Sequence, residues 1–170
     1  MKVMTRQQIE KLFGKFTYRE GRGGAIVITD KEWKKRNVVG ITFPIVGRTW
    51  CHREVFFDLH RIFYELEHEG YADKIDVKDY RKQGGCYVPR HTCWNSRKGL
   101  SHHSWGIAID LNVSTNGYGK TPTMPKVIIE KFAKYGWLWG GNFRTPDGMH
   151  FEVSDQWKSF RPVMPRRNNI

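Results

Sequence analysis

Two short segments of the sequence place imidazole and carboxylate side chains at positions that suit a metal ion. The first segment contains His103 and Asp110, and the second contains Asp147 and His150. Two imidazoles and one carboxylate form an open zinc site, because catalytic zinc typically keeps three protein ligands and leaves its fourth position to water. The residues therefore predict a zinc site formed by His103, Asp110 and His150. Asp147 lies three residues before a predicted ligand and could act as a base toward the activated water.

Alternating apolar residues predict the strands that would hold these side chains. Over residues 105–111 every second residue is bulky and apolar, and the opposite face is small except for Asp110. A Pro-Asp-Gly turn signal precedes residues 149–153, where the alternation resumes and His150 and Glu152 share one face. Pairing of the two strands would bring the three predicted ligands around one point. The residues expected to face the core are Trp105, Ile107, Ile109, Leu111, Met149, Phe151 and Val153.

The same residue types leave structural roles open. Asp110 could accept hydrogen bonds near a turn, and His150 could be a half-buried histidine with satisfied hydrogen bonds. Glu152 would either orient a ligand or serve only the fold. His102 adjoins a predicted ligand but is expected to point away from the site, because its segment resembles a strand.

The cysteines do not predict a second site. Cys86, His91 and Cys93 are close in sequence, but they lack the Cys-x-x-Cys spacing of a structural zinc site and no fourth ligand is evident. Together with Cys51 there are three cysteines, which cannot all pair within one chain, so we expect reduced thiols. No base is indicated beside Cys86, which disfavours a cysteine nucleophile.

Composition narrows the class of protein and of partner. The chain has 170 residues, of which 39% are hydrophobic and 14% aromatic, and this favours one folded domain over a disordered chain. No apolar run approaches the roughly 20 residues that span a bilayer, so membrane insertion is not expected. The 29 Lys and Arg residues exceed the 17 Asp and Glu residues, for a net charge of +12. That charge favours an anionic partner, either nucleic acid or a bacterial wall polymer.

Hydrophobic periodicity and turn residues predict the other elements. We expect helices at 5–14, 54–69 and 125–135, strands at 25–29 and 38–46, a glycine-rich loop at 16–24 and an irregular basic tail at 161–170. The first helix is expected to begin with a capping box of Thr5 and Gln8 and to bury Ile9, Leu12 and Phe13.

Three ordered motifs resemble those of the zinc D-alanyl-D-alanine carboxypeptidases and L-alanyl-D-glutamate endopeptidases, which cut the peptide part of bacterial peptidoglycan. Residues 101–110 match Ser-x-His-x-x-Gly-x-Ala-x-Asp, and residues 147–152 match Asp-x-x-His-Phe-Glu after a Trp-Gly-Gly at 139–141. Residues 85–90 resemble the upstream Gly-x-Tyr-x-x-Arg element. The similarity covers about 84–153 closely and 38–70 more loosely.

The resemblance implies a fold and a set of residue roles. The fold would be a single α+β domain over residues 1–170, of the hedgehog/DD-peptidase type, with a small antiparallel sheet and flanking helices. His103, Asp110 and His150 would bind one Zn²⁺ and Asp147 would be the catalytic base. Many relatives carry Glu at the base position, whereas Asp is the form found in the L-alanyl-D-glutamate branch and in phage lysins. An Asp there needs burial to raise its low pKa. The resemblance gives catalytic and substrate-binding roles to Arg90 and a substrate-binding role to Ser101.

The resemblance also implies a function. We expect a zinc metallopeptidase that hydrolyses a stem-peptide bond of peptidoglycan, as an L-alanyl-D-glutamate endopeptidase of the phage endolysin type. A D-alanyl-D-alanine carboxypeptidase is the alternative within the family, and a basic nucleic-acid-binding protein or metal nuclease is the alternative of another class. The expected partners are the peptidoglycan stem peptide and anionic wall polymers, without specific nucleic acid. We expect a monomer that resides in the host cytoplasm until release and then acts at the cell wall.

Overall fold

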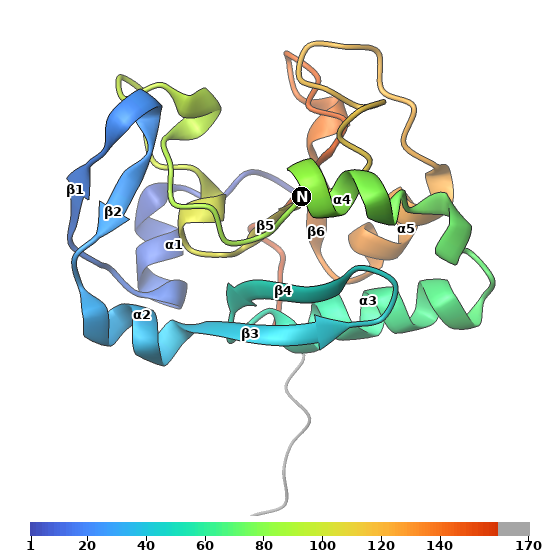
Figure 1. Ribbon diagram of the computed structural model, residues 1–170, viewed down its shortest axis with the longest axis horizontal. Coiled ribbons are helices and arrows are strands. Elements are labelled where there is room, and N and C mark those ends of the chain that lie inside the picture. Colours follow the sequence, from blue (N-terminus) through green and yellow to red (C-terminus); the bar gives the residue numbers. More distant parts are fainter. Residues whose placement is uncertain (160–170) are drawn as a thin grey trace, which may run out of the picture.

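The chain folds as an α+β structure in which helices surround small antiparallel sheets (Figure 1). The structure is a computed structural model, and it describes residues 1–159. The predicted basic tail at 161–170 lies outside the described residues. The α-helices are α1 (Arg6–Phe13), α2 (Lys31–Asn37), α3 (Phe56–His68), α4 (Val77–Gln83) and α5 (Lys126–Lys134). The strands are β1 (Tyr18–Glu20), β2 (Ile26–Ile28), β3 (Val38–Phe43), β4 (Gly47–His52), β5 (Ala108–Asp110), β6 (Trp137–Trp139) and β7 (His150–Val153).

Helix α1 confirms the first predicted helix in its position and capping. The Thr5 side chain accepts a hydrogen bond from the Gln8 backbone N–H, and the Gln8 side chain accepts one from the Thr5 backbone N–H. Ile9 and Phe13 are buried as predicted. Leu12 was expected on the same face, but its side chain is 49% exposed. An eight-residue helix on the surface buries only a narrow stripe, and Leu12 lies outside it.

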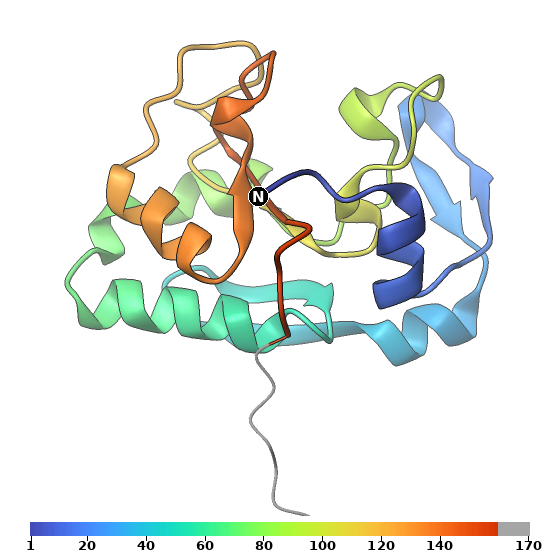
Figure 2. The same cartoon turned by 180° about the vertical axis from the view of Figure 1, so that it is seen from behind.

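Helices α3 and α5 pack against each other and form much of the core (Figure 2). Phe63 of α3 and Phe132 of α5 meet edge to face, with ring centroids 6.2 Å apart. Lys131 and Lys134 of α5 also bind the Glu65 carboxylate of α3, at 3.1 and 2.8 Å. Both helices lie where periodicity predicted them. Within residues 1–159, none of the helices could span a lipid bilayer.

Several short elements were not predicted. The segment expected to be a loop at 16–24 contains strand β1, which pairs with β2. Helices α2 and α4 and strand β4 also lie outside the predicted ranges. Helix α2 is almost entirely polar and buries only Trp33, so its sequence has no apolar period to detect. Strand β4 is recognised by its pairing with β3 after a tight turn. Such pairing depends on the partner strand and is not visible in the residues of β4 alone.

The three-stranded sheet β5-β7-β6 brings the two metal-binding segments together. Strands β5 and β7 are antiparallel, and their register places Asp110 opposite His150. Strand β5 is shorter than the expected 105–111, since residues 105–107 and Leu111 lie outside it. His102–Ser104, just before it, form one turn of 3-10 helix. The predicted core residues Trp105, Ile107, Ile109, Leu111, Phe151 and Val153 are each fully buried, whereas Met149 is half-buried and lines a cleft.

Candidate metal centre

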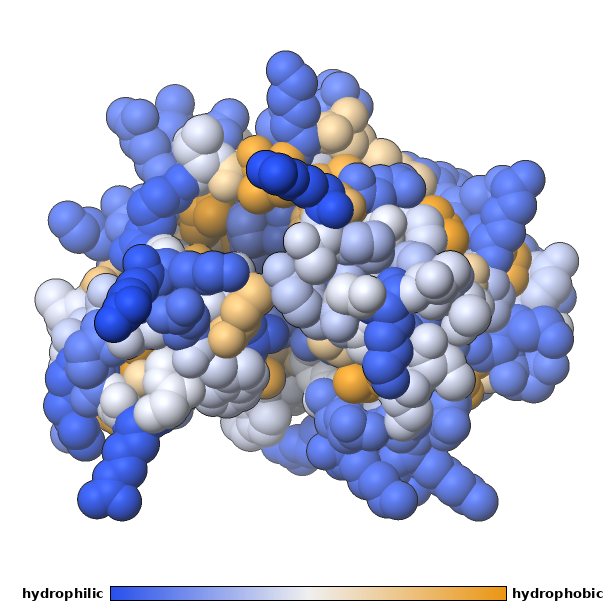
Figure 3. Space-filling view, turned by 90° about the horizontal axis from the view of Figure 1, so that it is seen from above, coloured by the Kyte–Doolittle hydropathy of each residue, from blue (hydrophilic) through white to orange (hydrophobic). Residues whose placement is uncertain are grey.

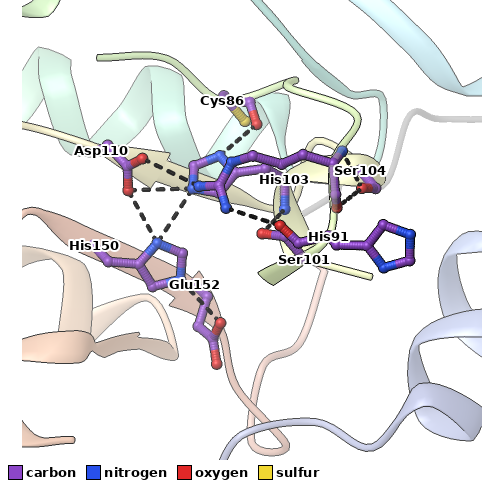
Figure 4. Close-up of polar contacts among 9 residues, drawn as sticks. Cys86, His91, Ser101, His103, Ser104, Asp110, His150 and Glu152 are labelled. Atoms are coloured by element: carbon purple, nitrogen blue, oxygen red, sulfur yellow. Dashed lines mark hydrogen bonds and ion pairs between the residues drawn. The ribbon is translucent and has the colours of Figure 1, made fainter. Parts of the chain in front are cut away.

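His103, Asp110 and His150 meet at one point, as the sequence predicted. His103 Nε2 lies 3.2 Å from His150 Nδ1 and 3.2 Å from Asp110 Oδ1, and His150 Nδ1 lies 3.0 Å from Asp110 Oδ1 (Figure 4). Ligands that surround zinc tetrahedrally at about 2.0–2.2 Å lie roughly 3.3–3.6 Å from one another. The three atoms therefore form a triangle of nearly the size that a single zinc ion requires.

The second nitrogen of each imidazole faces a hydrogen-bond acceptor. His103 Nδ1 lies 2.9 Å from the backbone oxygen of Cys86, and His150 Nε2 lies 3.0 Å from Glu152 Oε2. If each of these nitrogens donates its N–H outward, the two nitrogens that face each other both carry lone pairs. Together with the Asp110 oxygen they make three acceptors within contact distance.

Three acceptors at one point repel one another unless a cation lies among them. Burial alone would lower the pKa of His150, but hydrogen bonds to Asp110 and Glu152 outweigh this and raise it to about 10. A proton on His150 satisfies part of the triangle, whereas a divalent cation satisfies all three atoms at once. The donor set and its geometry therefore fit a catalytic zinc ion.

Glu152 and His102 form a layer behind the metal-binding residues. Glu152 Oε2 lies 2.7 Å from His102 Nδ1 as well as 3.0 Å from His150 Nε2. Burial raises the pKa of Glu152, but the two imidazoles outweigh it and hold the pKa well below its usual range. His102 was expected to point away from the site, and that was wrong: the 3-10 turn at 102–104 directs its ring toward Glu152. The contact with His150 favours the orienting role for Glu152.

Asp147 lies in the turn before β7, on the wall of the same cleft as His150. Burial raises the pKa of Asp147, and the negative charge of Asp110 adds to the increase. Its Oδ1 is buried and has no hydrogen-bond partner among the described residues. A carboxylate oxygen without a partner, beside a candidate metal centre, is suited to accept a proton from water.

The Trp-Gly-Gly motif explains how this turn approaches β6. A Cβ atom at Gly140 would lie 2.7 Å from the Asp147 carbonyl oxygen and 3.2 Å from His150 Cβ. The Asp147 N–H donates to the Gly140 carbonyl at 2.9 Å, and the Trp139 indole N–H donates to the Gly148 carbonyl at 2.8 Å. Only glycine at 140 allows the turn to come this close.

Arg90 and Ser101 also line the cleft. Arg90 Nη2 lies 3.7 Å from Asp110 Oδ2, so a positive charge stands beside the metal centre. The same guanidinium lies 5.4 Å from the ring centroid of Trp94. Ser101 is buried and its Oγ accepts a hydrogen bond from the His103 backbone at 3.3 Å. Ser101 therefore fixes the turn that holds His103, in addition to its expected contact with substrate.

The cleft has a volume of about 600 Å³ and opens on the upper side of the molecule (Figure 3). Its rim includes residues to which the motifs assign no individual role: Trp94, Lys98, Tyr118, Phe143 and Arg144. They lie in irregular segments whose apolar residues follow no period. A pocket of this size with an apolar wall and a few convergent polar groups suits a short peptide.

The cysteines and His91 take no part in a second metal site within the described residues. His91 Nε2 lies 3.0 Å from Glu20 Oε2, and His91 Nδ1 lies 2.7 Å from the Lys98 carbonyl. Burial raises the pKa of the Cys86 thiol well above its ordinary value, and Cys86 Sγ donates to the Gly106 carbonyl. All three cysteines are free, as predicted.

Comparison with known proteins agrees with the motifs. No solved structure is significantly similar to the chain. Residues 94–153 match the family model described as D-alanyl-D-alanine carboxypeptidase, and this stretch contains all three candidate ligands and Asp147. The family consists of zinc-dependent peptidases that act on peptidoglycan. The segment that forms the candidate metal centre thus matches the model of the D-alanyl-D-alanine carboxypeptidase family, as its motifs predicted.

Proposed function

We propose that the protein is a zinc-dependent peptidoglycan peptidase that cleaves the bond between L-alanine and D-glutamate in the stem peptide, as endolysins do. The observation that supports it best is the triangle of His103 Nε2, Asp110 Oδ1 and His150 Nδ1, open to a cleft that also contains Asp147 and Arg90. The match to a family of zinc peptidases supports the same chemistry.

His103, Asp110 and His150 would hold the ion, and each of the other residues has a task beside it. When bound, zinc would lower the pKa of a water molecule and polarise the scissile carbonyl. Asp147, whose pKa is raised by burial, accepts a proton from the attacking water and passes it to the leaving amine. Arg90 places its positive charge where negative charge develops on the carbonyl oxygen. Ser101 holds the turn of His103 and offers a polar contact to the peptide.

A D-alanyl-D-alanine carboxypeptidase is the second candidate, and the description of the matching family favours it. The aspartate at the base position favours the endopeptidase, because the resemblance associates Asp with that branch and Glu with many other relatives. The two activities differ in where the peptide continues: an endopeptidase must accommodate chain on both sides of the scissile bond. The cleft of about 600 Å³ has room for such a peptide.

The proposal extends to the surroundings of the reaction. The net charge of +12 favours association with anionic wall polymers once the enzyme reaches the wall. We propose that it works there as a monomer, after a period in the cytoplasm of the host cell.

The experiment is digestion of purified peptidoglycan followed by mass spectrometry of the products. New amino-terminal D-glutamate would support the endopeptidase, whereas free D-alanine would support the carboxypeptidase. If zinc-loaded protein releases neither product, both candidates are contradicted. A nuclease assay on the same preparation tests the alternative of a metal nuclease.

A further inference from the structure

A second groove lies between β4 and α4, which are both on the near side in Figure 1. Its volume is about 460 Å³. Arg48 and Trp50 of β4, Arg81 of α4 and Tyr87 from the following segment contribute to its walls. None of these residues belongs to the metal centre, and the proposed reaction uses none of them.

The indole ring of Trp50 forms a partly exposed aromatic surface in this groove. Trp50 is 51% exposed, whereas Trp33, Trp105 and Trp137 are buried. A Cβ atom at Gly40 would lie 3.1 Å from the indole ring, so the ring rests on bare backbone of the neighbouring strand. The Trp50 carbonyl accepts a hydrogen bond from the Tyr87 N–H at 3.0 Å, which ties the two aromatic residues together. A rigid, exposed ring of this kind suits packing against the C–H face of a sugar.

The groove is also positively charged. The Arg48 guanidinium lies 5.7 Å from the Trp50 ring centroid. Arg81 is exposed at the opposite wall. None of the described residues that line the groove is acidic. The groove therefore combines a stacking surface with cations, which fits a sugar polymer that bears carboxylates.

The groove and the metal centre share one stretch of backbone. Residues 85–88 line the groove. On their other side the Gly85 carbonyl accepts from the Asp110 N–H at 3.1 Å, and the Cys86 carbonyl lies 2.9 Å from His103 Nδ1. A polymer in the groove is therefore separated from the metal-binding residues by a single segment of chain.

We propose that this groove is a second substrate-binding site, which holds the glycan strand of peptidoglycan, with its stem carboxylates near Arg48 and Arg81, while the cleft acts on a stem peptide. The proposal rests on the proposed function. A sugar ring would stack on Trp50 and the wall's carboxylates would pair with the arginines. A single-stranded nucleic acid has a similar chemistry, but the position beside a peptidase-type centre favours the peptidase's own polymer.

The test separates binding to the wall from cleavage. Binding to purified sacculi, stripped of phosphate-containing polymers, is measured by co-sedimentation in an Asp147→Asn background. Hydrolysis of a soluble muropeptide is measured with the same groove variants in protein that keeps Asp147. We expect Trp50→Ala, and separately the double variant Arg48→Gln/Arg81→Gln, to weaken sacculus binding by roughly tenfold. Hydrolysis of the soluble muropeptide should stay within about twofold of wild type.

Matched controls remove equivalent groups elsewhere on the surface. Tyr64→Ala removes another exposed aromatic residue, and Arg19→Gln/Arg22→Gln removes the same charge from two exposed positions. These controls should bind like the parent protein. The double arginine variant, which changes only surface side chains, still tests the proposal if Trp50→Ala fails to fold.

The outcomes are distinguishable. Equal binding of the groove variants and their controls to stripped sacculi would overturn the proposal, as would binding that requires the phosphate-containing polymers. A loss of single-stranded DNA binding without a loss of sacculus binding would also overturn it and would favour a nucleic-acid site. If wild type cleaves no muropeptide but the groove variants lose sacculus binding, the proposed function fails and the wall-binding groove stands.

Discussion

Asp110 Oδ1 and His150 Nδ1 lie 3.0 Å apart because their residues are direct partners in the antiparallel pair of β5 and β7. Opposite residues on paired strands point to the same face, so the register alone brings the two side chains together. His103 reaches the same point from the 3-10 turn before β5. The candidate metal centre thus depends on one strand register and one turn, and a shift of one residue in that register would separate its ligands.

Replacement of Glu152 by glutamine should weaken zinc binding by about 10–100-fold while the fold is retained. The charged acceptor that holds the His150 N–H at 3.0 Å would become a neutral amide. Affinity is measured by competition with a chromophoric chelator. Glu20→Gln is the matched control, since Glu20 makes a similar contact with His91 away from the centre. Equal affinity of the two variants would show that Glu152 has only a structural role.

Replacement of Asp147 by asparagine should abolish cleavage while zinc remains bound. The asparagine amide cannot accept the proton, but it is close in shape to the original side chain. Asp147→Glu should retain part of the activity, because a carboxylate is preserved. The measurement pairs muropeptide hydrolysis with zinc content. Full activity of the asparagine variant would exclude Asp147 as the base.

As the pH is lowered, the activity of the wild-type enzyme should fall at a higher pH than it would if the base were an ordinary aspartate, whose pKa is about 3.9. Burial raises the pKa of Asp147, and the base must be deprotonated to work. The rate therefore falls as pH drops through that raised pKa. Zinc content is determined at each pH, so that loss of metal is not mistaken for protonation of the base.

A methyl group at Gly140 should disturb the site more than the fold. In Gly140→Ala the added Cβ meets the Asp147 carbonyl at 2.7 Å and His150 Cβ at 3.2 Å, so the turn must move. We expect a loss of about 1–3 kcal/mol of stability and a larger proportional loss of activity. Gly99→Ala is the control, because its Cβ would meet nothing within 4 Å. Thermal unfolding and hydrolysis are compared for both variants, and equal behaviour would contradict the close approach.

Glu65 should contribute to stability at neutral pH and lose that contribution in acid. Burial raises its pKa, but hydrogen bonds from Lys134, Tyr135 and Lys131 outweigh this and lower the pKa to about 2. An unfolded glutamate has a pKa of about 4.3, so the stabilisation is complete above that pH and is lost as pH falls through about 2. After allowance for solvent screening we expect Glu65→Gln to cost about 1–2 kcal/mol at pH 7 and little below about pH 2. The exposed Glu130→Gln, whose partner is Lys126, should cost less.

The site was predictable from sequence because its ligands lie on strong local patterns. The alternation over 105–111 and 149–153 identified the buried faces, and six of the seven predicted core residues are fully buried. The motifs predicted a common site for His103, Asp110, His150 and Asp147, and the structure brings the first three to one point and Asp147 into the same cleft. The long helices α3 and α5 were equally visible, since each has an apolar stripe and a following glycine.

Other features depend on contacts that a local pattern does not contain. His102 reaches Glu152 only because residues 102–104 form a 3-10 turn in place of strand. Strands β1 and β4 exist through their partners, and α2 is too polar to show a period. The cleft rim and the groove at Trp50 arise where separate segments meet, so neither could be predicted from the spacing of residues.

The most direct test of the account is the metal content and activity of wild type beside Asp110→Asn and His150→Ala, with His91→Ala as the control. Wild type and the control should bind one zinc ion per chain, lose stem-peptide cleavage on complete removal of the metal and regain it when zinc is restored. The two ligand variants should bind no zinc under the conditions in which wild type binds one ion, and they should cleave no stem peptide. Undiminished cleavage by fully demetallated wild type, or by either ligand variant, would contradict a metal centre formed by His103, Asp110 and His150.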